Sequence, residues 1–164
     1  MRLGVDRLLA DRESIARAGD HRALRVWLRL LTCTQLIERR VRSRLRERFA
    51  TTLPRFDLMA QLERHPGGLK MNELSRLLMV TGGNVTAIVD QLEKERLVER
   101  VDEPADRRAF RIQLTRAGEK SFAEMARAHE AWVVELLSGM SRREQDELLK
   151  LLAKVKQHAA EVEA

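Results

Sequence analysis

Apolar residues recur every three or four positions between residues 20 and 50, which is the spacing of one helix face. Asp20 is a candidate N-cap for this long helix, which is expected to run to about Ala50. Its first half is apolar on nearly every side, as in a helix buried on several sides. Its second half has one narrow apolar stripe between arginines. The stripe along the whole helix consists of Val26, Leu30, Cys33, Ile37, Val41, Leu45 and Phe49. A shorter leading helix is expected over residues 6–18.

Three short helices and a hairpin are predicted after the break at "TTLP". The first helix has Pro54 in its first turn and is closed by "HPGG". The next two are joined by a tight turn that contains glycine, as in a helix-turn-helix. Their expected inward residues are Met71, Leu74, Leu77 and Leu78 in one helix, and Val85, Ile88, Val89 and Leu92 in the other. The segments "LVERV" and "AFRIQL" then alternate like strands on either side of a polar loop.

The C-terminal part is predicted to form two further helices. One begins near Thr115 and has an apolar side from Phe122 to Met140, and the other is opened by the capping box of Ser141 and Glu144. The last helix is expected to bury Leu148, Leu151, Leu152 and Val155.

The order of elements predicts a mainly α fold, in which a winged helix-turn-helix with a small β-hairpin wing is inserted between long helices. The expected division is an N-terminal dimerisation part over residues 1–53, a DNA-binding domain over 54–115 and C-terminal dimerisation helices over 116–164. The long helices are too apolar to stand alone, which favours a dimer.

Composition narrows the class of protein. No run of the 164 residues approaches 18 apolar positions, so no membrane span is expected. The N-terminus carries acids and lacks an apolar core, so no signal peptide is expected. The single Cys33 is typical of a reducing cytoplasm. The net charge of +6 favours a polyanionic partner, and it is concentrated in residues 21–50, where nine arginines face two glutamates.

The start of the second helix of the helix-turn-helix, "TGGNVT", is small and polar. A recognition helix enters the major groove through such residues, since Asn pairs with adenine edges and Thr offers a hydroxyl and a methyl group. Thr81, Gly83, Asn84 and Thr86 are therefore candidate DNA contacts. The alternative is an ordinary helix start capped by Thr81 or Gly83.

The loop "VDEPADRRAF" contains Asp106, Arg107 and Arg108. One interpretation is a solvated hairpin tip with a local ion pair. The other is a wing in which Asp106 orients one guanidinium and leaves the second free for the minor groove of DNA. Segment 99–111 holds four acids and four arginines, which favours an oriented arginine over a diffuse basic patch.

An enzyme is not expected. The four histidines are scattered, and zinc-cluster, P-loop and nucleophile motifs are absent from the sequence, so no cofactor or metal is expected either. Two binding functions remain as alternatives to a regulator. One is an architectural or constitutive DNA-binding protein, and the other is a winged-helix module for protein interaction.

The segment from Leu78 to Glu119 resembles the core of the MarR family of bacterial transcriptional regulators. The matching motifs are "GNVT", "LVER", the "DRR" of the wing and "LT-x-x-G", and the helix order extends the resemblance over roughly residues 22–160. It implies a homodimer on palindromic promoter DNA, usually a repressor. It also implies that Asn84, Val85 and Thr86 lie in the major groove, and that Asp106 and Arg108 form the wing's acid–arginine pair, with Arg107 beside them.

The resemblance also implies an effector, because such regulators commonly bind small phenolic or carboxylic ligands between the dimerisation helices and the winged domain. The candidate contacts are Trp27, Leu31, Arg39, Phe56, Met59, His129 and Trp132, although apolar residues at helical spacing usually form core.

The stretch around "TTLPRFDLMAQLERHPGG" is similar to regulators of hydroxycinnamate and aromatic-acid catabolism, which implies an aromatic acid or its coenzyme A thioester as effector. Arg39, Arg42 and Arg46 share one helix face and are able to hold phosphates, whether of such a ligand or of DNA; the alternative is a solvated face. Redox sensing is not expected, since the chain has no tyrosine and Cys33 lies among apolar residues.

Overall fold

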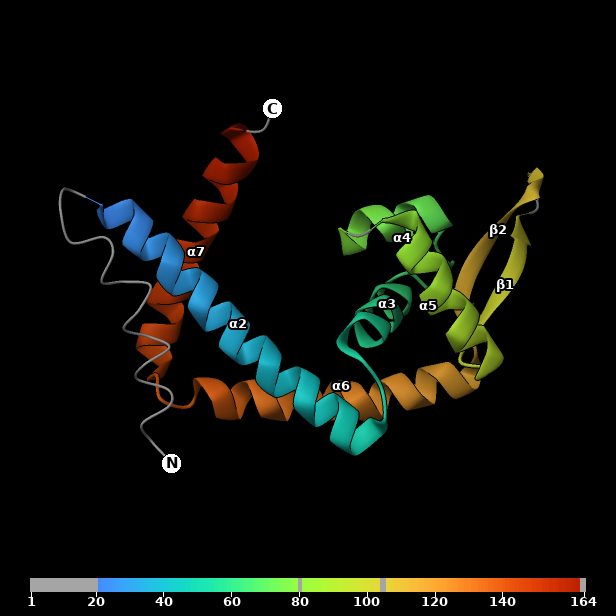
Figure 1. Cartoon of the computed structure of the whole chain (residues 1–164), viewed down its shortest axis with the longest axis horizontal. Coiled ribbons are helices and arrows are strands. Elements are labelled where there is room, and N and C mark those ends of the chain that lie inside the picture. The colour runs from blue at the N-terminus through green and yellow to red at the C-terminus, as the bar shows by residue number, and fades with distance from the viewer. Residues whose placement is uncertain (1–20, 80, 104–105, 163–164) are drawn as a thin grey trace. The chain divides into compact units, whose positions relative to one another are not determined.

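The structure, a computed structural model, describes residues 21–79, 81–103 and 106–162, with the side chains of 103–109 outside the description. The predicted leading helix and Asp20 lie outside these residues. The described part contains six helices and one hairpin, arranged as in Figure 1. They are α2 (Arg22–Phe49), α3 (Leu53–Arg64), α4 (Met71–Leu78), α5 (Gly82–Lys94), β1 (Val98–Glu103), β2 (Asp106–Leu114), α6 (Arg116–Leu137) and α7 (Arg142–Val162). The expected fold class, mainly α with a winged helix-turn-helix, is confirmed.

The chain divides into two compact units between His129 and Glu130. In the first, α2 ends at Ala50, whose left-handed backbone (φ 49°) turns its N–H back onto the last carbonyls of the helix. Val41 and Leu45 are buried, but Trp27 is 58% exposed and Cys33 is exposed as well. The expectation that the first half of this helix is buried on several sides is therefore wrong for a single chain, because only its C-terminal part has the neighbours that would cover it.

The helix-turn-helix is built around a small apolar core. Pro54 lies in the first turn of α3, as predicted. The left-handed backbone of Met79 (φ 53°) ends α4 and starts the turn to α5. Leu77 is 43% exposed rather than inward, since the short α4 covers the core with one side only. The side chains that are at most 2% exposed here are Leu58, Met59, Leu62, Leu74, Val85, Val89 and Leu92, each worth about 1.5 to 3 kcal/mol of hydrophobic stabilisation when buried.

The wing is an antiparallel hairpin in which Val98 pairs with Leu114 and Asp102 with Phe110, with a register irregularity after Asp102. Its inner face is set by alternation, since Val98 and Ile112 are buried. Leu69 adds a short bridge to Ile112 through two backbone hydrogen bonds of 2.9 and 3.1 Å. The sequence pattern did not predict this bridge.

Gly68 precedes the bridge. Both its backbone conformation and the lack of room for a Cβ atom require glycine at this position. Its φ is +75°, and a Cβ atom there would lie 2.9 Å from the carbonyl oxygen of Ile112. The Arg111 guanidinium donates to the carbonyl oxygen of Gly68 at 3.0 Å, so the same turn is held from the wing side.

The base of the wing is tied to α6 by a compact set of hydrogen bonds. The Thr115 hydroxyl donates to the carbonyl oxygen of Arg96 at 2.7 Å and accepts from the N–H of Gly118 at 3.0 Å. A Cβ atom on Gly118 would lie 1.9 Å from the carbonyl oxygen of Leu97. The "LT-x-x-G" sequence thus has a physical reason: threonine caps α6 and glycine lets the helix approach the strand backbone.

The second unit contains the end of α6 and all of α7. The predicted capping box is confirmed, since the Ser141 N–H donates to the Glu144 carboxylate at 2.7 Å and the Glu144 N–H donates to the Ser141 hydroxyl at 3.3 Å. The expected burial of the α7 stripe is wrong for a single chain, because Leu151 and Val155 are 60% and 51% exposed and Leu148 is half-buried. In the described part of the chain, no helix has the length and apolar character to cross a membrane.

Candidate nucleic-acid interface

The N-terminus of α5 is exposed and open. Thr81 stands at the N-cap in an extended conformation, and its carbonyl oxygen accepts from the N–H groups of Asn84 and Val85. Asn84 is exposed. A Cβ atom on Gly83 would meet nothing within 4 Å, so packing does not require glycine there. The helix therefore presents a small, polar end to solvent, and a helix N-terminus favours an anion.

The two sides of α5 differ sharply. Val85, Val89 and Leu92 are fully buried, whereas Asn84 and Thr86, which flank Val85 around the helix, are exposed. Val85, which the resemblance placed in the major groove, is therefore corrected here to a core residue that supports the helix from within.

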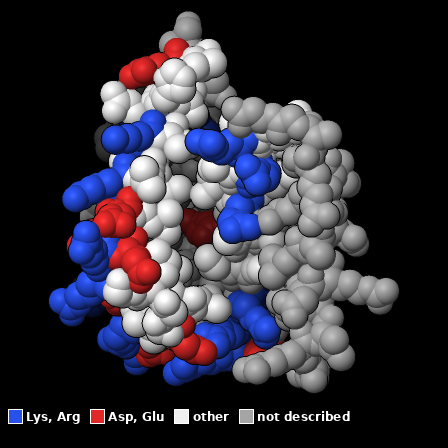
Figure 2. Space-filling model, turned by 90° about the vertical axis from the view of Figure 1, so that its left-hand side faces the viewer, with Lys and Arg blue, Asp and Glu red and all other residues white. Residues whose placement is uncertain are grey.

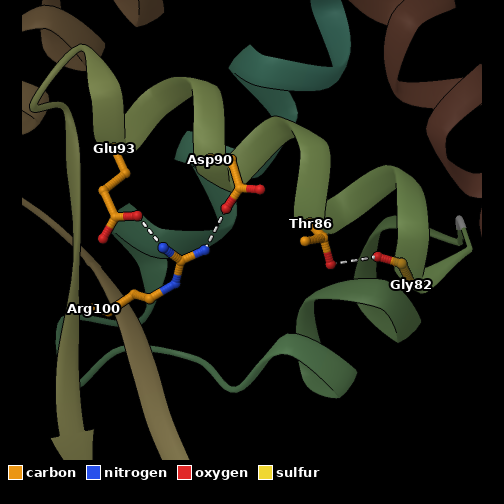
Figure 3. Close-up of polar contacts among 5 residues, drawn as sticks. All are labelled: Gly82, Thr86, Asp90, Glu93 and Arg100. Carbon is orange, nitrogen blue, oxygen red and sulfur yellow. Dashed lines mark hydrogen bonds and ion pairs between the residues drawn. The ribbon is translucent and has the colours of Figure 1, made fainter.

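The hydroxyl hydrogen of Thr86 is already used in a hydrogen bond within its own helix. Its hydroxyl donates to the carbonyl oxygen of Gly82 at 3.1 Å (Figure 3). A threonine hydroxyl has one hydrogen and two acceptor lone pairs. Thr86 is therefore left with an acceptor oxygen and a methyl group for an incoming partner.

Arg100 on β1 joins the wing to the other half of α5, a residue that sequence reasoning missed. Its guanidinium pairs with Asp90 at 2.5 Å and with Glu93 through a second nitrogen (Figure 3). It also lies 5.4 Å from the ring centroid of Phe110. The hydrogen bond to Asp90, followed by the charge of Glu93, raises the pKa of Arg100 above its ordinary value. The available signal in the sequence was the pair of acids three residues apart on a helix that precedes a strand arginine.

The wing tip contains the three residues singled out from the sequence. The backbone of Asp106, Arg107 and Arg108 begins β2, and Asp106 pairs in register with Glu103. Their side chains lie outside the described part of the structure. Their contact with DNA stays a prediction from the sequence.

Basic and acidic residues are interspersed on one face of the molecule (Figure 2). On the face drawn in Figure 2, Lys and Arg occur at several separate places with Asp and Glu between them. One group on α2 borders a hollow of about 390 Å³, which is lined by Gln35, Glu38, Arg39, Arg42, Ser43 and Arg46. Arg42 pairs with Glu38 at 3.2 Å. Among the described residues, Arg39 and Arg46 have no ion-pair partner, so the hollow has two uncompensated cations.

Two charged residues of this hollow, Arg42 and Glu38, influence the pKa of Asp57 on α3. Burial raises the pKa of its carboxyl above the ordinary value, the Arg42 charge opposes the shift, and the Glu38 charge adds to it. The charges of Arg42 and Glu38 on α2 therefore act on a carboxyl of α3.

The predicted effector residues fall into different environments. Phe56 and Met59 are 6% and 1% exposed and belong to the core. His129 stacks on Phe56 with ring centroids 4.8 Å apart, and burial lowers the pKa of the imidazole. Trp27 is exposed and Leu31 is half-buried on α2, while Trp132 is buried in the second unit. Arg39 is the one predicted effector residue that borders the α2 hollow.

A second hollow of about 380 Å³ lies between α3, β2 and α6 and was not predicted. It is lined by Leu62, Glu63, Pro66, Leu114, Glu119, Phe122, Ala123 and Ala126. In the residues that the structure describes, no three His, Cys, Asp or Glu side chains gather as metal ligands. Cys33 is exposed, which corrects the expectation that it is enclosed by apolar residues.

A helix-turn-helix with an exposed polar recognition helix and a hairpin tied to its C-terminal half defines the winged-helix class of nucleic-acid-binding proteins. A sequence model described as "MarR family" matches residues 51–109. A MarR family transcriptional regulator from Silicibacter pomeroyi is 32% identical, with a TM-score of 0.72 over 86% of this chain and 99% of that one. The chain belongs to the MarR family.

Two further comparisons agree with this assignment. YkoM of Bacillus subtilis, an HTH-type transcriptional regulator, is 31% identical over 57% of this chain, and the match spans 60% of its own length. The fold is shared with Sco3205 from Streptomyces coelicolor, a MarR family regulator solved in complex with DNA, at 22% identity and a TM-score of 0.74 over 87% of this chain and 90% of that one.

Proposed function

We propose that this protein is a ligand-responsive transcriptional regulator that acts in the cytoplasm, binds palindromic promoter DNA as a homodimer and acts as a repressor. The observation that carries the proposal is the N-terminus of α5, where exposed Asn84 and Thr86 project from a helix held by the fully buried Val85 and Val89. A rigid helix with a polar, uncovered first turn has the shape and chemistry of a major-groove reader.

Readout of bases would rest on two side chains. Asn84 can donate to and accept from an adenine edge, while Thr86 can accept a hydrogen bond and contact a thymine methyl group. Gly83 leaves room for the helix end to approach a phosphate. At the wing, Arg108 oriented by Asp106, together with Arg107, would enter the adjacent minor groove.

The apolar surfaces at both chain ends support a homodimer. In α2, Leu24, Val26 and Trp27 are 46%, 52% and 58% exposed, and in α7, Leu149 and Leu151 are 66% and 60% exposed. A soluble protein rarely leaves such rows uncovered, and a second copy would supply the missing cover. Two recognition helices related by a twofold axis would require a palindromic operator.

The proposed effector is a small aromatic acid or its coenzyme A thioester. Arg39 and Arg46 beside the α2 hollow offer guanidinium groups to phosphates or to a carboxylate. His129 against Phe56 offers an aromatic surface, and Trp27, Leu31, Met59 and Trp132 remain candidate contacts. The effector would release DNA only to the extent that it binds the DNA-free arrangement of the dimer more tightly.

A constitutive or architectural DNA-binding protein is the second candidate. It is favoured by the burial of Phe56 and Met59, since an effector could reach them only by displacing core packing. Such a protein would bind many duplexes with similar affinity and would ignore small molecules.

Fluorescence anisotropy on DNA from upstream of the protein's own gene separates the two candidates. Aromatic acids and their coenzyme A thioesters are titrated into the complex with the wild type and with R39Q/R46Q. Release by a thioester that weakens in R39Q/R46Q supports phosphate binding at α2. Release by the free acid alone that weakens in R39Q/R46Q assigns the arginines to its carboxylate, and release that R39Q/R46Q leaves unchanged gives them no ligand role. Equal affinity for scrambled DNA, with no release by either compound, contradicts the proposal in favour of the constitutive binder.

A further inference from the structure

The inner face of the wing changes character partway along β1. Val98 and Arg100 lie two residues apart on one strand and therefore point to the same face of the sheet. Val98 is buried, whereas the next inward position on β1 is Arg100, which lies directly opposite the buried Ile112 of β2. At this level of the wing, β1 therefore contacts α5 through ion pairs, while β2 still contributes a buried apolar side chain.

The contact fixes orientation as well as distance. One guanidinium nitrogen of Arg100 pairs with Asp90 and the other with Glu93, which lies one helical turn further along α5 (Figure 3). The Phe110 ring lies 5.4 Å from the guanidinium carbon. A planar group held by two acids and a ring has a set plane, whereas a lysine ammonium has none.

The acids that Arg100 engages lie on the same helix as the proposed base-reading residues. Asp90 follows Thr86 by four residues, so the two lie on one line of the α5 surface. Figure 3 shows Thr86 and Asp90 on successive turns, with Arg100 reaching Asp90 from the strand. The Arg100 contact therefore joins the wing to the side of α5 that carries Thr86.

We propose that Arg100 is a positioning residue for DNA recognition. It acts through Asp90 and Glu93 to hold the wing and the recognition helix at the angle at which both engage one half-site. The proposal rests on the proposed function and deepens it, because it assigns part of sequence discrimination to a residue that itself need not touch a base.

The test uses the full-length protein and the duplex that the wild type selects from a random-sequence pool, compared with a scrambled duplex of equal length. The main variant is R100Q/E93Q, which removes the contact without changing net charge. Its matched control is R143Q/E147Q, which removes an exposed ion pair of α7 whose side chains are 89% and 60% exposed. R100K tests whether charge alone suffices.

We expect R100Q/E93Q to lower the ratio of selected to scrambled affinity about tenfold, a typical penalty for one imperfect base contact. Affinity for the scrambled duplex and the salt dependence of binding should stay unchanged, because no phosphate contact is lost. R100K should lose most of the same ratio, and R143Q/E147Q should keep it. A purely structural role would lower both affinities together, which overturns the proposal, as does an unchanged ratio.

Hydrogen exchange on the free protein provides a readout that needs no DNA. Amides of β1 and β2 should exchange faster in R100Q/E93Q, while those of α3 and α4 keep their protection. Unchanged exchange in the hairpin overturns the proposal. If the wild type selects no sequence at all, the proposed regulator function fails, whereas failure of the Arg100 proposal alone leaves wild-type selection intact.

Discussion

Thr86 donates its hydroxyl hydrogen to the carbonyl oxygen of Gly82, 3.1 Å away and one turn earlier in α5. The bond determines what the side chain can offer to DNA. Its oxygen can only accept, and the major-groove groups that donate are the amino groups of adenine and cytosine.

Thr86→Val keeps the shape of the side chain and removes the acceptor. We expect it to weaken binding to the selected duplex by about 1 to 3 kcal/mol, as for loss of one base contact. Thr86→Ser keeps the oxygen and should retain most of the affinity, as measured by anisotropy. If Thr86→Ser is the more damaging change, the methyl group makes the contact instead.

Two glycines should respond in opposite ways to alanine. Gly118→Ala places a Cβ atom against the carbonyl oxygen of Leu97 and should lower the free energy of unfolding by about 1 to 3 kcal/mol through overpacking. Gly83→Ala meets open space within the helix and should raise stability by about 0.5 to 1 kcal/mol. Urea unfolding measures both.

Gly83→Ala should nevertheless weaken DNA binding if the helix end approaches a phosphate. A variant that is more stable and binds less well separates the fold from the interface. Unchanged affinity would show that this end of α5 stays clear of the DNA backbone.

Replacement of Arg108 by Ala should weaken binding to the selected duplex by about 1 to 3 kcal/mol, because a guanidinium is lost from the minor groove. Arg143→Ala on α7 removes the same charge from an 89% exposed side chain of the second unit and serves as the control. If the two changes have equal, small effects on affinity, the wing is a solvated hairpin tip and its arginines do not contact DNA.

His129 should make stability depend on pH. Burial lowers the pKa of its imidazole below the ordinary 6.5, so the unfolded chain takes up the proton more readily than the folded one. The folded state is therefore favoured above pH 6.5, and this stabilisation is lost as the pH falls from there toward the lower pKa of the folded protein.

Urea unfolding of the wild type and of His129→Gln at pH 7.5 and 5.5 checks this dependence. The stability advantage of the wild type over the variant should shrink at the lower pH, since glutamine does not titrate. An advantage that grows on acidification would mean that a carboxylate stabilises the charged imidazole.

Periodicity in the sequence was enough to define the helices and the wing, because a helix with Val85, Val89 and Leu92 on one side has a single way to bury them. It also left Asn84 and Thr86 outside the apolar face, and both are exposed. The resemblance placed Val85 in the major groove together with Asn84 and Thr86. Successive residues of a helix are about 100° apart around its axis, so Val85 points into the core while its two neighbours do not.

Other features depend on contacts between segments that no local pattern encodes. The bridge of Leu69 to Ile112 and the pairing of Arg100 with Asp90 and Glu93 join segments whose register is set only in the folded chain. The apolar stripe of α7 shows a further limit. The pattern identified Leu151 as a residue that needs cover, but it could not say that the cover is missing within one chain.

The hydrogen bonds of Thr115 and the close approach of Gly118 leave no freely rotating joint between the hairpin and the first turn of α6. The hairpin and the first turn of α6 therefore move together as one rigid piece. A small rotation of this start of α6 would displace the far end of the strands more than their base, because displacement grows with distance from the axis of rotation.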